Sequence, residues 1–508
     1  MLMSAADYRE SLRRYRPRVF VNGRQIGCVA DEPALRPGVN ALGVTYDYAL
    51  NPTHRHLALA DNHDGSGQVN RFISLNRSTE DLQAKLELTR LVCQETGCAM
   101  RYLSMDGLNA LYQLSHRLDD ATGSEYRPRV KAYLEEVQSK DLTVGIAMTD
   151  AKGDRRLRPH EQPRMDSYLH VTERRADGVV ISGVKAIVTA GPCVHELLVL
   201  PGRAMTPEDA PFAIACAVPV DAPGLTMIAR PAGRPGEDTA LFSGHYGQTT
   251  AVCVFEDVFV PWERVFLCGE HEHSEFLTKS YATHHRHTCI AARAGFGDLL
   301  IGAGVLMLES NGLDAARNTH LRDTMVELIK IVEGFYACGV AASVYGYADP
   351  AGILEPDAVF SNIGKLLLSN QIYDMYRLAH EVSGGLIVAL PGPDEDHNPH
   401  TAASLAEIFR GSPDVPADRR VQTARFIEDL TASDAGGWMS LISLHGGGSP
   451  QALKAEIYRR YPVQDKRQLV ERLIERGLSS TQPSASREPG QCCDRGCSDP
   501  AAPPAAAG

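Results

Sequence analysis

The chain has no hydrophobic run long enough to cross a membrane. Its longest strongly apolar stretch, Leu299 to Leu308, is about half of what a membrane-spanning helix needs. The first twenty residues mix acidic and basic side chains and contain no apolar block before a small-residue cleavage site, so they do not resemble a secretory signal. These absences predict a cytoplasmic protein without a membrane partner, in which the 12 cysteines are thiols or possible metal ligands rather than a disulfide framework.

Excess positive charge and nucleotide-binding motifs are also lacking. The 51 Lys and Arg residues face 63 Asp and Glu residues, for a net charge of −12, which argues against the basic face that nucleic-acid binding requires. No GxxxxGK phosphate loop occurs, and the glycines of GFGDLLIGAG (residues 295–304) lie inside a helical pattern instead of at a strand-to-helix turn. We therefore expect no nucleic-acid partner and find no NAD(P)H motif.

The residue composition and the apolar periodicity change along the sequence, and these changes predict an α+β protein in four segments. Residues 1–140 are predicted to be helical, as in the stretch 78–97, where Ser78 and Asp81 have capping-box spacing and Gly97 is a stop. Residues 141–270 contain short β-branched runs between Gly, Pro and Asp, which indicate an antiparallel sheet or small barrel. Residues 271–478 have long 3.6-residue apolar patterns, typical of a helical bundle, and residues 479–508 are predicted to be disordered.

Seven motifs run in order through these segments. They are NALGVTYDYA, GQVNRFISLNRSTEDL, MDGLNALY, GIAMTDAKGDRRLRP, HHRHTCIAARAGFGDLLIGA, HEVSGGLIV and SLHGGGSPQA. From about residue 5 to residue 475 the chain resembles the family that joins 4-hydroxyphenylacetate 3-hydroxylase to 4-hydroxybutyryl-CoA dehydratase, and it is closer in texture to the dehydratase branch. The resemblance implies an acyl-CoA dehydrogenase-like fold, bound FAD in a cleft between the β domain and the C-terminal bundle, and a homotetramer or homodimer.

The resemblance also implies which residues hold the flavin. Glycines let the backbone approach a phosphate, arginine neutralises it, and hydroxyls meet ring heteroatoms. Taken alone, AKGDRR is more often a charged surface turn, and its place within the ordered motifs favours the flavin interpretation. The residues are Met148, Thr149, Asp150, Asp154, Arg155 and Thr189, with Ser383, Gly384 and Gly385 of the VSGG motif expected to approach the flavin of a neighbouring subunit.

Two of the four iron ligands of the dehydratase branch are replaced. That branch holds a four-iron, four-sulfur cluster with three cysteines and a histidine, and here Cys98 and His285 match while Tyr102 and Ala292 stand at the other two positions. Cluster irons take thiolate or imidazole donors at each corner. Cys289 is near, but at four residues from His285 it projects differently from a residue seven away. We therefore expect no iron–sulfur cluster and no other metal.

Other residues that act on substrate in the two branches are replaced as well. In the dehydratase branch these are two glutamates, a tyrosine and a lysine, and in the hydroxylase branch a phenol clamp. The replacements are Thr250, Ile442, Cys289 and Arg293 in the first set, and Leu103, Gly107 and Ile146 in the second. Neither Thr nor Ile can serve as a general acid or base at such a site. The substrate is expected to be a small organic molecule other than a simple 4-hydroxyphenyl acid.

His285, Arg286, Arg293 and Tyr102 form the candidate catalytic set. His285 is suited to acid–base work or to a hydrogen bond beside the flavin, and the alternative is a core histidine bonded to a backbone carbonyl. Arg293 and Tyr102 could orient an anionic or carbonyl substrate, or else fill the space left by the iron–sulfur cluster as a buried polar pair.

Three further motifs are expected to have structural roles or to be weak candidates for function. His284 and His287 are expected on the helix surface. The HGGGSP stretch (residues 445–450) is expected to be a glycine-rich turn that shapes the bundle, and the CCDRGC stretch (residues 492–497) is a weak candidate for metal binding or adventitious disulfides.

Three functions follow from these expectations. The first is a monooxygenase in which FAD, reduced by a separate flavin reductase, reacts with O2 to hydroxylate a small organic substrate at carbon or nitrogen. The second is a cluster-free dehydratase or isomerase acting on an acyl-CoA. The third is a non-catalytic flavin-fold subunit that binds a partner.

Overall fold

The computed structural model describes residues 1–416 and 418–481. Residues 1–460 form one compact unit, and residues 461–508 form a second. The described part of the second unit is a helix, α14 (Val463–Thr481). The part of the predicted disordered tail from residue 482 on, with its CCDRGC stretch, lies outside the described residues.

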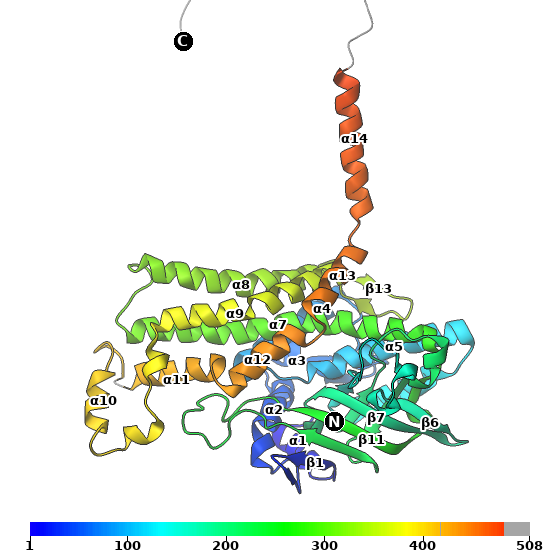
Figure 1. Cartoon of the computed structure of the whole chain (residues 1–508), viewed down its shortest axis with the longest axis horizontal. Helices are drawn as coiled ribbons and strands as arrows, with labels where there is room; N and C mark the ends of the chain where they lie inside the picture. Colours follow the sequence, from blue (N-terminus) through cyan, green and yellow to red (C-terminus); the bar gives the residue numbers. More distant parts are fainter. Residues whose placement is uncertain (417, 482–508) are drawn as a thin grey trace, which may run out of the picture. The chain divides into compact units, whose positions relative to one another are not determined.

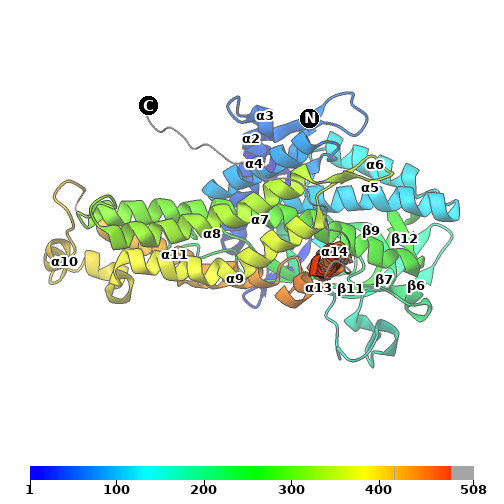
Figure 2. The same cartoon turned by 90° about the horizontal axis from the view of Figure 1, so that it is seen from above.

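Helices open and close the first unit, as the sequence predicts (Figure 1). The N-terminal group is α1 (Ala5–Leu12), α2 (Arg36–Leu50), α3 (Arg55–Ala58), α4 (Thr79–Thr96), α5 (Tyr102–Thr122) and α6 (Tyr126–Ser139). The C-terminal group is α7 (Ser274–Ser310), α8 (Thr319–Val344), α9 (Ala358–Ser383), α10 (Ala402–Ile408), α11 (Arg419–Thr431), α12 (Asp434–His445) and α13 (Pro450–Arg460). The long helices α7, α8 and α9 lie side by side (Figures 1 and 2).

Between the two helical groups the chain forms two main sheets. The larger has the order β2-β1-β10-β11-β7-β6, and the smaller has the order β12-β9-β8-β5. Their strands are β1 (Arg18–Val21), β2 (Arg24–Gln25), β5 (Val144–Ala147), β6 (His170–Arg174), β7 (Gly178–Thr189), β8 (Glu196–Val199), β9 (Ile214–Pro219), β10 (Leu225–Ala229), β11 (Thr250–Pro261) and β12 (Val265–Cys268). Two small ribbons pair β3 (Leu59–Asp61) with β4 (Gln68–Asn70) and β13 (Tyr347–Ala348) with β14 (Leu354–Glu355).

The pairing is mostly antiparallel, as expected, but two pairs are parallel. β5 runs parallel to β8, and β1, which comes from the N-terminal segment, runs parallel to β10. The central pair is β7 with β11, two strands of 12 residues each that run antiparallel. Strand periodicity does not reveal the direction of a neighbouring strand, so the sequence could not have predicted the parallel pairs.

Helix α4 begins and ends where its sequence predicts. The Ser78 hydroxyl accepts a hydrogen bond from the Asp81 N–H, and Gly97 ends the helix with φ of +67°. A positive φ at this position favours glycine because a Cβ would be strained there. The resulting sharp turn places Cys98 directly between α4 and α5.

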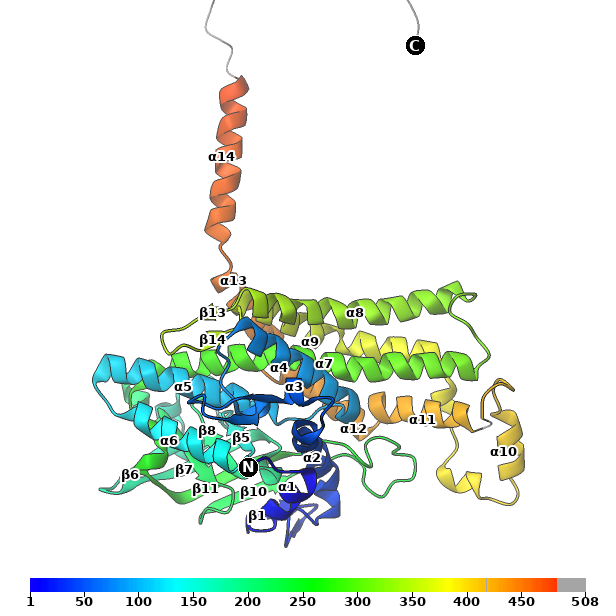
Figure 3. The same cartoon turned by 180° about the vertical axis from the view of Figure 1, so that it is seen from behind.

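Helix α7 is the central helix of the unit. Figure 3 shows α4 lying against it and α5 between it and the strands. At Gly295 an added Cβ would lie 2.4 Å from the Arg90 carbonyl oxygen, so the close approach of α4 requires glycine. The segment 271–310 is long and apolar enough to span a membrane by length and composition, but 67% of its apolar window is buried inside the protein, as in a core helix.

Candidate functional site

Four of the residues singled out in the sequence meet in the interior where α4, α5 and α7 converge. We call Cys98, Tyr102, His285 and Arg293 the α5–α7 site. Cys98 lies in the turn between α4 and α5, Tyr102 is the first residue of α5, and His285 and Arg293 lie on α7, all of them buried. The Tyr102 hydroxyl lies 3.9 Å from the Cys98 sulfur, and the rings of Tyr102 and His285 stack with centroids 6.1 Å apart. Three of the four candidate catalytic residues are therefore neighbours.

His285 is held between an acid and a thiol. Its Nδ1 lies 3.5 Å from Asp106 Oδ2, and its Nε2 lies 3.4 Å from the Cys289 sulfur. Burial alone would lower the pKa of His285, but Cys289 and Asp106 outweigh it and raise this pKa to about 9. The imidazole is thus held in its charged form at neutral pH.

Asp106 carries the negative charge of this group. Its Oδ1 lies 2.9 Å from the Lys85 ammonium and accepts a 2.8 Å hydrogen bond from the Thr288 hydroxyl. Burial alone would raise the pKa of Asp106, but Lys85 and His285 outweigh burial and lower this pKa to about 2. Lys85 and Asp106 are both fully buried, so the pair is a buried ion pair shared with His285.

Arg293 is a buried cation without a carboxylate partner. Its Nε donates to the Ser443 hydroxyl at 2.5 Å, and its Nη1 donates to the Cys98 sulfur at 3.3 Å. A hydrogen bond with Cys93 and the charge of Arg293 lower the pKa of Cys98 against the effect of burial. In the part of the chain that the structure describes, no acidic side chain forms an ion pair with Arg293.

A second buried amine lies close to the same group. Lys365 on α9 donates to the Ser369 hydroxyl at 2.5 Å and to the Ser443 carbonyl at 2.7 Å. Burial lowers its pKa to about 7. Lys365 can therefore exchange a proton near neutral pH.

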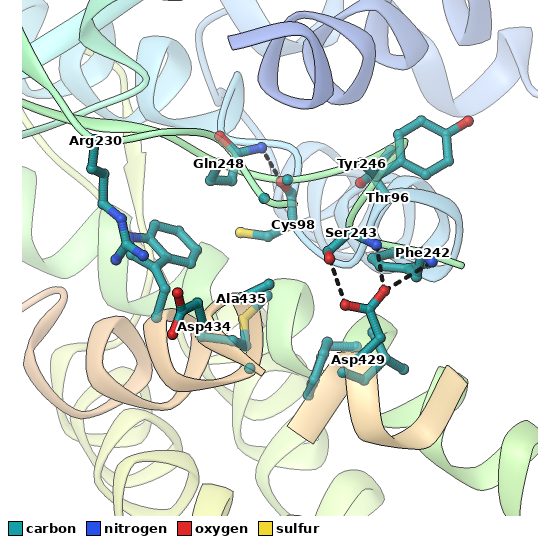
Figure 4. A pocket seen from close by; sticks show the side chains of 17 residues that line it. Thr96, Cys98, Arg230, Phe242, Ser243, Tyr246, Gln248, Asp429, Asp434 and Ala435 are labelled. Carbon is teal, nitrogen blue, oxygen red and sulfur yellow. Dashed lines mark hydrogen bonds between the residues drawn. The ribbon is translucent and has the colours of Figure 1, made fainter. Parts of the chain in front are cut away.

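A cavity of about 40 Å³ adjoins Cys98 (Figure 4). Its wall includes Cys98, Gln248, Phe296, Trp438 and Met439. The Gln248 amide nitrogen donates to the Cys98 carbonyl, while its Oε1 is buried without a hydrogen-bond partner. On another wall the Asp429 carboxylate accepts hydrogen bonds from the Phe242 and Ser243 N–H groups at 2.9 and 2.7 Å, which fastens the 233–247 loop to α11.

The residues of the AMTDAKGDRR motif follow β5. Asp150 is buried and committed to internal contacts, because its Oδ1 lies 2.7 Å from the Lys185 ammonium and accepts from the Leu169 N–H at 3.1 Å. The backbone carbonyls of Met148 and Thr149 accept hydrogen bonds from Lys185 Nζ and the Ala186 N–H at 3.0 and 2.8 Å. The Thr149 side-chain hydroxyl, by contrast, forms no hydrogen bond among the described residues.

Three cations in or near this motif form no ion pair among the described residues. We call Lys152, Arg155 and Arg203 the cationic corner. Burial and the charges of Arg155 and Arg203 lower the pKa of Lys152 although Asp150 raises it, and no ion pair is formed by any of the three within the described residues. Lys152 also has a positive φ of +74°. Asp154 does not join them, because its carboxylate pairs at 2.6 Å with Arg156.

Thr189 and the VSGG motif lie on other elements. Thr189 ends β7 opposite Thr250 of β11, and the Thr250 hydroxyl accepts a 3.2 Å hydrogen bond from the Trp438 indole at the cavity wall. Ser383 donates to the His380 carbonyl, and Gly384 and Gly385 end α9 with φ of +66° and +75°. Both glycines are required by this left-handed turn.

Two family models match the chain. "4-Hydroxyphenylacetate 3-hydroxylase N terminal" matches residues 4–267, and "4-hydroxyphenylacetate 3-hydroxylase C terminal" matches residues 275–475. The chain belongs to the 4-hydroxyphenylacetate 3-hydroxylase family. The resemblance that the motifs indicated is confirmed.

Curated members of this family include enzymes of two kinds. The 4-hydroxybutyryl-CoA dehydratase/vinylacetyl-CoA-Delta-isomerase of Clostridium aminobutyricum is 34% identical over 92% of this chain and 99% of its own length. The oxygenase component of 4-hydroxyphenylacetate 3-monooxygenase from Geobacillus sp. is 25% identical over 93% of this chain and 96% of its own length.

Solved structures confirm the predicted α+β, acyl-CoA dehydrogenase-like fold. An oxygen-tolerant archaeal 4-hydroxybutyryl-CoA dehydratase from N. maritimus has a TM-score of 0.89 at 30% identity and covers 97% of this chain and 98% of its own. The oxygenase component of 4-hydroxyphenylacetate 3-monooxygenase complexed with FAD has a TM-score of 0.80 at 21% identity and covers 94% of this chain and 100% of its own.

The positions that hold the iron–sulfur cluster in the dehydratase branch are now placed. Cys98 and His285 converge with Tyr102 and Arg293, while Ala292 contributes only a buried methyl group. Over residues 1–416 and 418–481 no three His, Cys, Asp or Glu side chains are arranged to hold a metal ion. The donor set that remains does not fit a four-iron, four-sulfur cluster.

Two histidines predicted to lie on the helix surface are fully buried. His284 Nε2 lies 3.1 Å from Gln113 Oε1, and His287 Nε2 lies 2.9 Å from the Ser343 hydroxyl. The prediction was wrong because α7 is surrounded by other helices, with the partner of His284 on α5 and the partner of His287 on α8.

Arg286 points away from the other catalytic candidates. Its Nε donates to the Gly447 carbonyl at 2.7 Å, and its Nη1 donates to the Asn362 side chain at 2.9 Å. Gly447 and Gly448 have φ of +76° and +112° in the turn between α12 and α13, as expected of a glycine-rich turn. The contacts of Arg286 therefore hold this turn against α7.

Sequence reasoning missed Lys85, Asp106, Lys365 and Gln248. Lys85 has a detectable signal, since it follows Leu82 by three residues on the apolar face of α4. Asp106 and Lys365 likewise interrupt buried helix faces. A charged residue within an apolar stripe predicts a buried partner on another helix, although the sequence does not say which one.

Proposed function

We propose that the chain is an FAD-dependent monooxygenase, the oxygenase component of a two-component system that hydroxylates a small organic substrate. The observation that carries the proposal is the Arg293 guanidinium, 3.3 Å from the Cys98 sulfur. It places a fixed cation where iron coordination would need an open thiolate, and neither Tyr102 nor Ala292 restores the lost donors. Redox chemistry at this site then falls to a flavin alone.

The residues of the AMTDAKGDRR region suit FAD. The cationic corner has three positive side chains that form no ion pair among the described residues, and a diphosphate would neutralise them. The unpartnered hydroxyl of Thr149 is suited to the ring heteroatoms, and we propose the same role for Thr189. We assign Met148, Thr149, Arg155 and Thr189 to FAD binding, with Asp150 positioning the strand end through Lys185. Reduced FAD, when bound, supplies the electrons that activate O2.

His285 is the residue we propose to hold the proton of the reaction. Asp106 and Cys289 keep its imidazole charged, so a proton is available on Nε2. Tyr102 and Arg293 orient the substrate from the neighbouring positions, and Phe296, Trp438 and Met439 supply an apolar part of the cavity wall. The assignment of His285, Tyr102 and Arg293 as catalytic residues is part of this proposal.

The proposed partners follow from the same reaction. With no NAD(P)H motif in the sequence, a separate flavin reductase would deliver reduced FAD. We also propose a cytoplasmic homotetramer or homodimer, in which Ser383, Gly384 and Gly385 approach the flavin of a neighbouring subunit.

A stopped-flow experiment tests the proposal. Reduced FAD bound to the protein is mixed with O2, and flavin oxidation and H2O2 release are followed together. The proposal predicts that H2O2 appears later than it does with free reduced FAD, and that a hydroxylatable substrate lowers its yield. Immediate, stoichiometric H2O2 release that no substrate from a panel of phenols and amines alters would contradict it.

A cluster-free dehydratase or isomerase acting on an acyl-CoA is the second candidate. It is favoured by the 34% identity to the clostridial dehydratase and the TM-score of 0.89 to the archaeal one. His285 and Lys365 would supply its acid and base. Turnover of 4-hydroxybutyryl-CoA without a reductant would favour this candidate over the monooxygenase, whereas protein that retains no FAD at micromolar concentration would indicate a non-catalytic subunit.

A further inference from the structure

We infer that a second cavity of the protein binds an apolar organic anion, such as an aryl or alkyl carboxylate. This cavity has a volume of about 390 Å³ and lies between α7, α11 and the 233–247 loop, and we call it the α7–α11 cavity. Pockets for small molecules commonly measure about 300–1,000 Å³. The inference goes beyond the proposed function and does not depend on it, because none of the residues assigned to FAD or to the α5–α7 site lines this cavity.

One face of α7 forms the floor of the cavity. Leu299, Gly302, Ala303 and Leu306 line it at the spacing i, i+3, i+4 and i+7, which places four apolar residues on one side of a helix. At Gly302 an added Cβ would meet no atom within 4 Å, so the helix surface is open to a ligand there. Leu306 is 41% exposed, and a ligand that covered this floor would remove apolar surface from water.

The opposite wall is an aromatic ring and a loop. Phe426 of α11 lines the cavity together with Leu241 of the loop, and Leu241 is 46% exposed. The Phe426 ring meets the Phe242 ring edge-on with centroids 5.8 Å apart, and Phe242 lines the smaller, separate cavity. The loop is also fastened to α11 by the hydrogen bonds that Asp429 accepts. Contacts within the protein therefore hold this wall in place.

Among the residues that the structure describes, the wall has one charged side chain without an ion pair. The other charged residue, Asp298, is engaged, since its carboxylate accepts hydrogen bonds from Arg90 at 2.8 Å and from Gln94 at 2.7 Å. Arg419, the first residue of α11, is exposed and forms no ion pair within the described part of the chain. A free guanidinium beside an apolar floor suits a ligand with one anionic group on an apolar body.

Two other polar side chains of the wall form hydrogen bonds with α11 and its N-cap. The Gln422 amide donates to the Asp418 carboxylate, and the Thr423 hydroxyl donates to the Arg419 carbonyl at 2.8 Å. Donors for a neutral polar ligand are therefore few, whereas a carboxylate can accept two hydrogen bonds from the Arg419 guanidinium. The charge and the apolar floor together favour an amphipathic anion over a sugar or a cation.

The test is titration calorimetry of the full-length protein with naphthalene-2-carboxylate, with and without added FAD. Naphthalene-2-methanol is the matched control ligand, because it has the same rings and no charge. We expect one carboxylate bound per chain, at least about tenfold more tightly than the alcohol, and unaffected by FAD. Absence of saturable binding, as when a second copy of the chain covers the cavity, or equal affinities for the two ligands would overturn the inference. Loss of binding on addition of FAD would also overturn it, because the cavity would then belong to the flavin site.

Two pairs of variants locate the ligand. Gly302→Leu fills the open surface of α7 and should abolish binding, whereas Gly334→Leu, at an α8 glycine that is equally open, should not. Leucine is a better helix former than glycine, so both variants should fold. Arg419→Gln should weaken carboxylate binding by about tenfold and leave the affinity for the alcohol unchanged. Arg55→Gln, which removes an exposed arginine of α3, is its control. Full affinity in Gly302→Leu, or the same affinity in Arg419→Gln as in Arg55→Gln, would show that the ligand binds elsewhere.

Discussion

The α5–α7 site and the cationic corner satisfy their charges in different ways. At the first, Asp106 pairs with both Lys85 and His285, His285 also contacts Cys289, and Arg293 is held by Ser443 and Cys98. At the second, Arg155 and Arg203 lower the pKa of Lys152, Asp150 is already paired with Lys185, and none of the three cations forms an ion pair among the described residues. The cations of the first site have partners within the protein, whereas those of the second form no ion pair among the described residues, as is typical of side chains that bind an anionic ligand.

The largest expected effect comes from restoring the missing iron ligands at the α5–α7 site. The triple substitution Tyr102→Cys, Ala292→Cys and Arg293→Lys removes the guanidinium and supplies thiols at both altered positions. We expect this variant to bind iron and acid-labile sulfide on anaerobic reconstitution while the wild-type protein does not. Equal iron content in the two proteins would show that Arg293 and the lost donors do not determine whether the protein binds an iron–sulfur cluster.

The next largest effect is expected at the buried Lys85–Asp106 pair. Asp106→Asn leaves Lys85 without its counter-ion and should lower the free energy of unfolding by about 3–5 kcal/mol, measured by denaturant titration. The double variant Lys85→Met/Asp106→Leu should recover more than half of that loss.

The matched control is the exposed pair of Lys330 and Glu327 on α8. Glu327→Gln should change the free energy of unfolding by less than about 0.5 kcal/mol. If Asp106→Asn is as mild as this control, the charges at the α5–α7 site are not internally coupled.

At the cationic corner a substitution should affect ligand binding and leave folding intact. Lys152→Ala and Arg155→Ala should each weaken FAD binding by about tenfold, because each removes a charge-assisted contact. Equilibrium dialysis gives the affinity, and thermal unfolding without FAD should be unchanged or improved. Asp154→Ala is the control: its carboxylate pairs with Arg156, and a loss of affinity as large as that of Arg155→Ala would contradict the comparison.

The smallest predicted effect is a pH dependence at His285. The folded pKa, about 9, lies above the ordinary value of 6.5, so the charged imidazole stabilises the fold below pH 6.5 and this stabilisation is lost as the pH rises toward 9. The difference in unfolding free energy between wild type and His285→Gln should shrink over that interval. A difference that grows with pH would mean that His285 is neutral in the fold.

The parts of the fold that depend on local signals were predictable from the sequence. Ser78 and Gly97 mark the ends of α4, and the apolar periodicity predicts the helical, β and helical segments. The parallel β1–β10 pairing was not predictable, because it joins residues about 200 positions apart in the sequence and strand periodicity carries no direction. Burial of His284 and His287 was missed for a related reason, since their partners lie on α5 and α8.

The candidate site was predictable as a set of positions and not as a set of contacts. The ordered motifs identified Cys98, Tyr102, His285 and Arg293, and the structure brings these four together. It does not bring Arg286 into the group, because that side chain reaches the Gly447 turn. The Lys85–Asp106 pair and the orphaned Gln248 oxygen depend on tertiary packing, which spacing along one helix cannot reveal.

The most direct test of the central claim is a native mass spectrum of protein purified without oxygen, combined with iron and acid-labile sulfide assays. If the cationic corner still binds FAD while Tyr102, Ala292 and Arg293 have replaced the iron ligands, each subunit should carry one FAD and no iron or sulfide. Stoichiometric iron and sulfide beside the flavin would contradict the account.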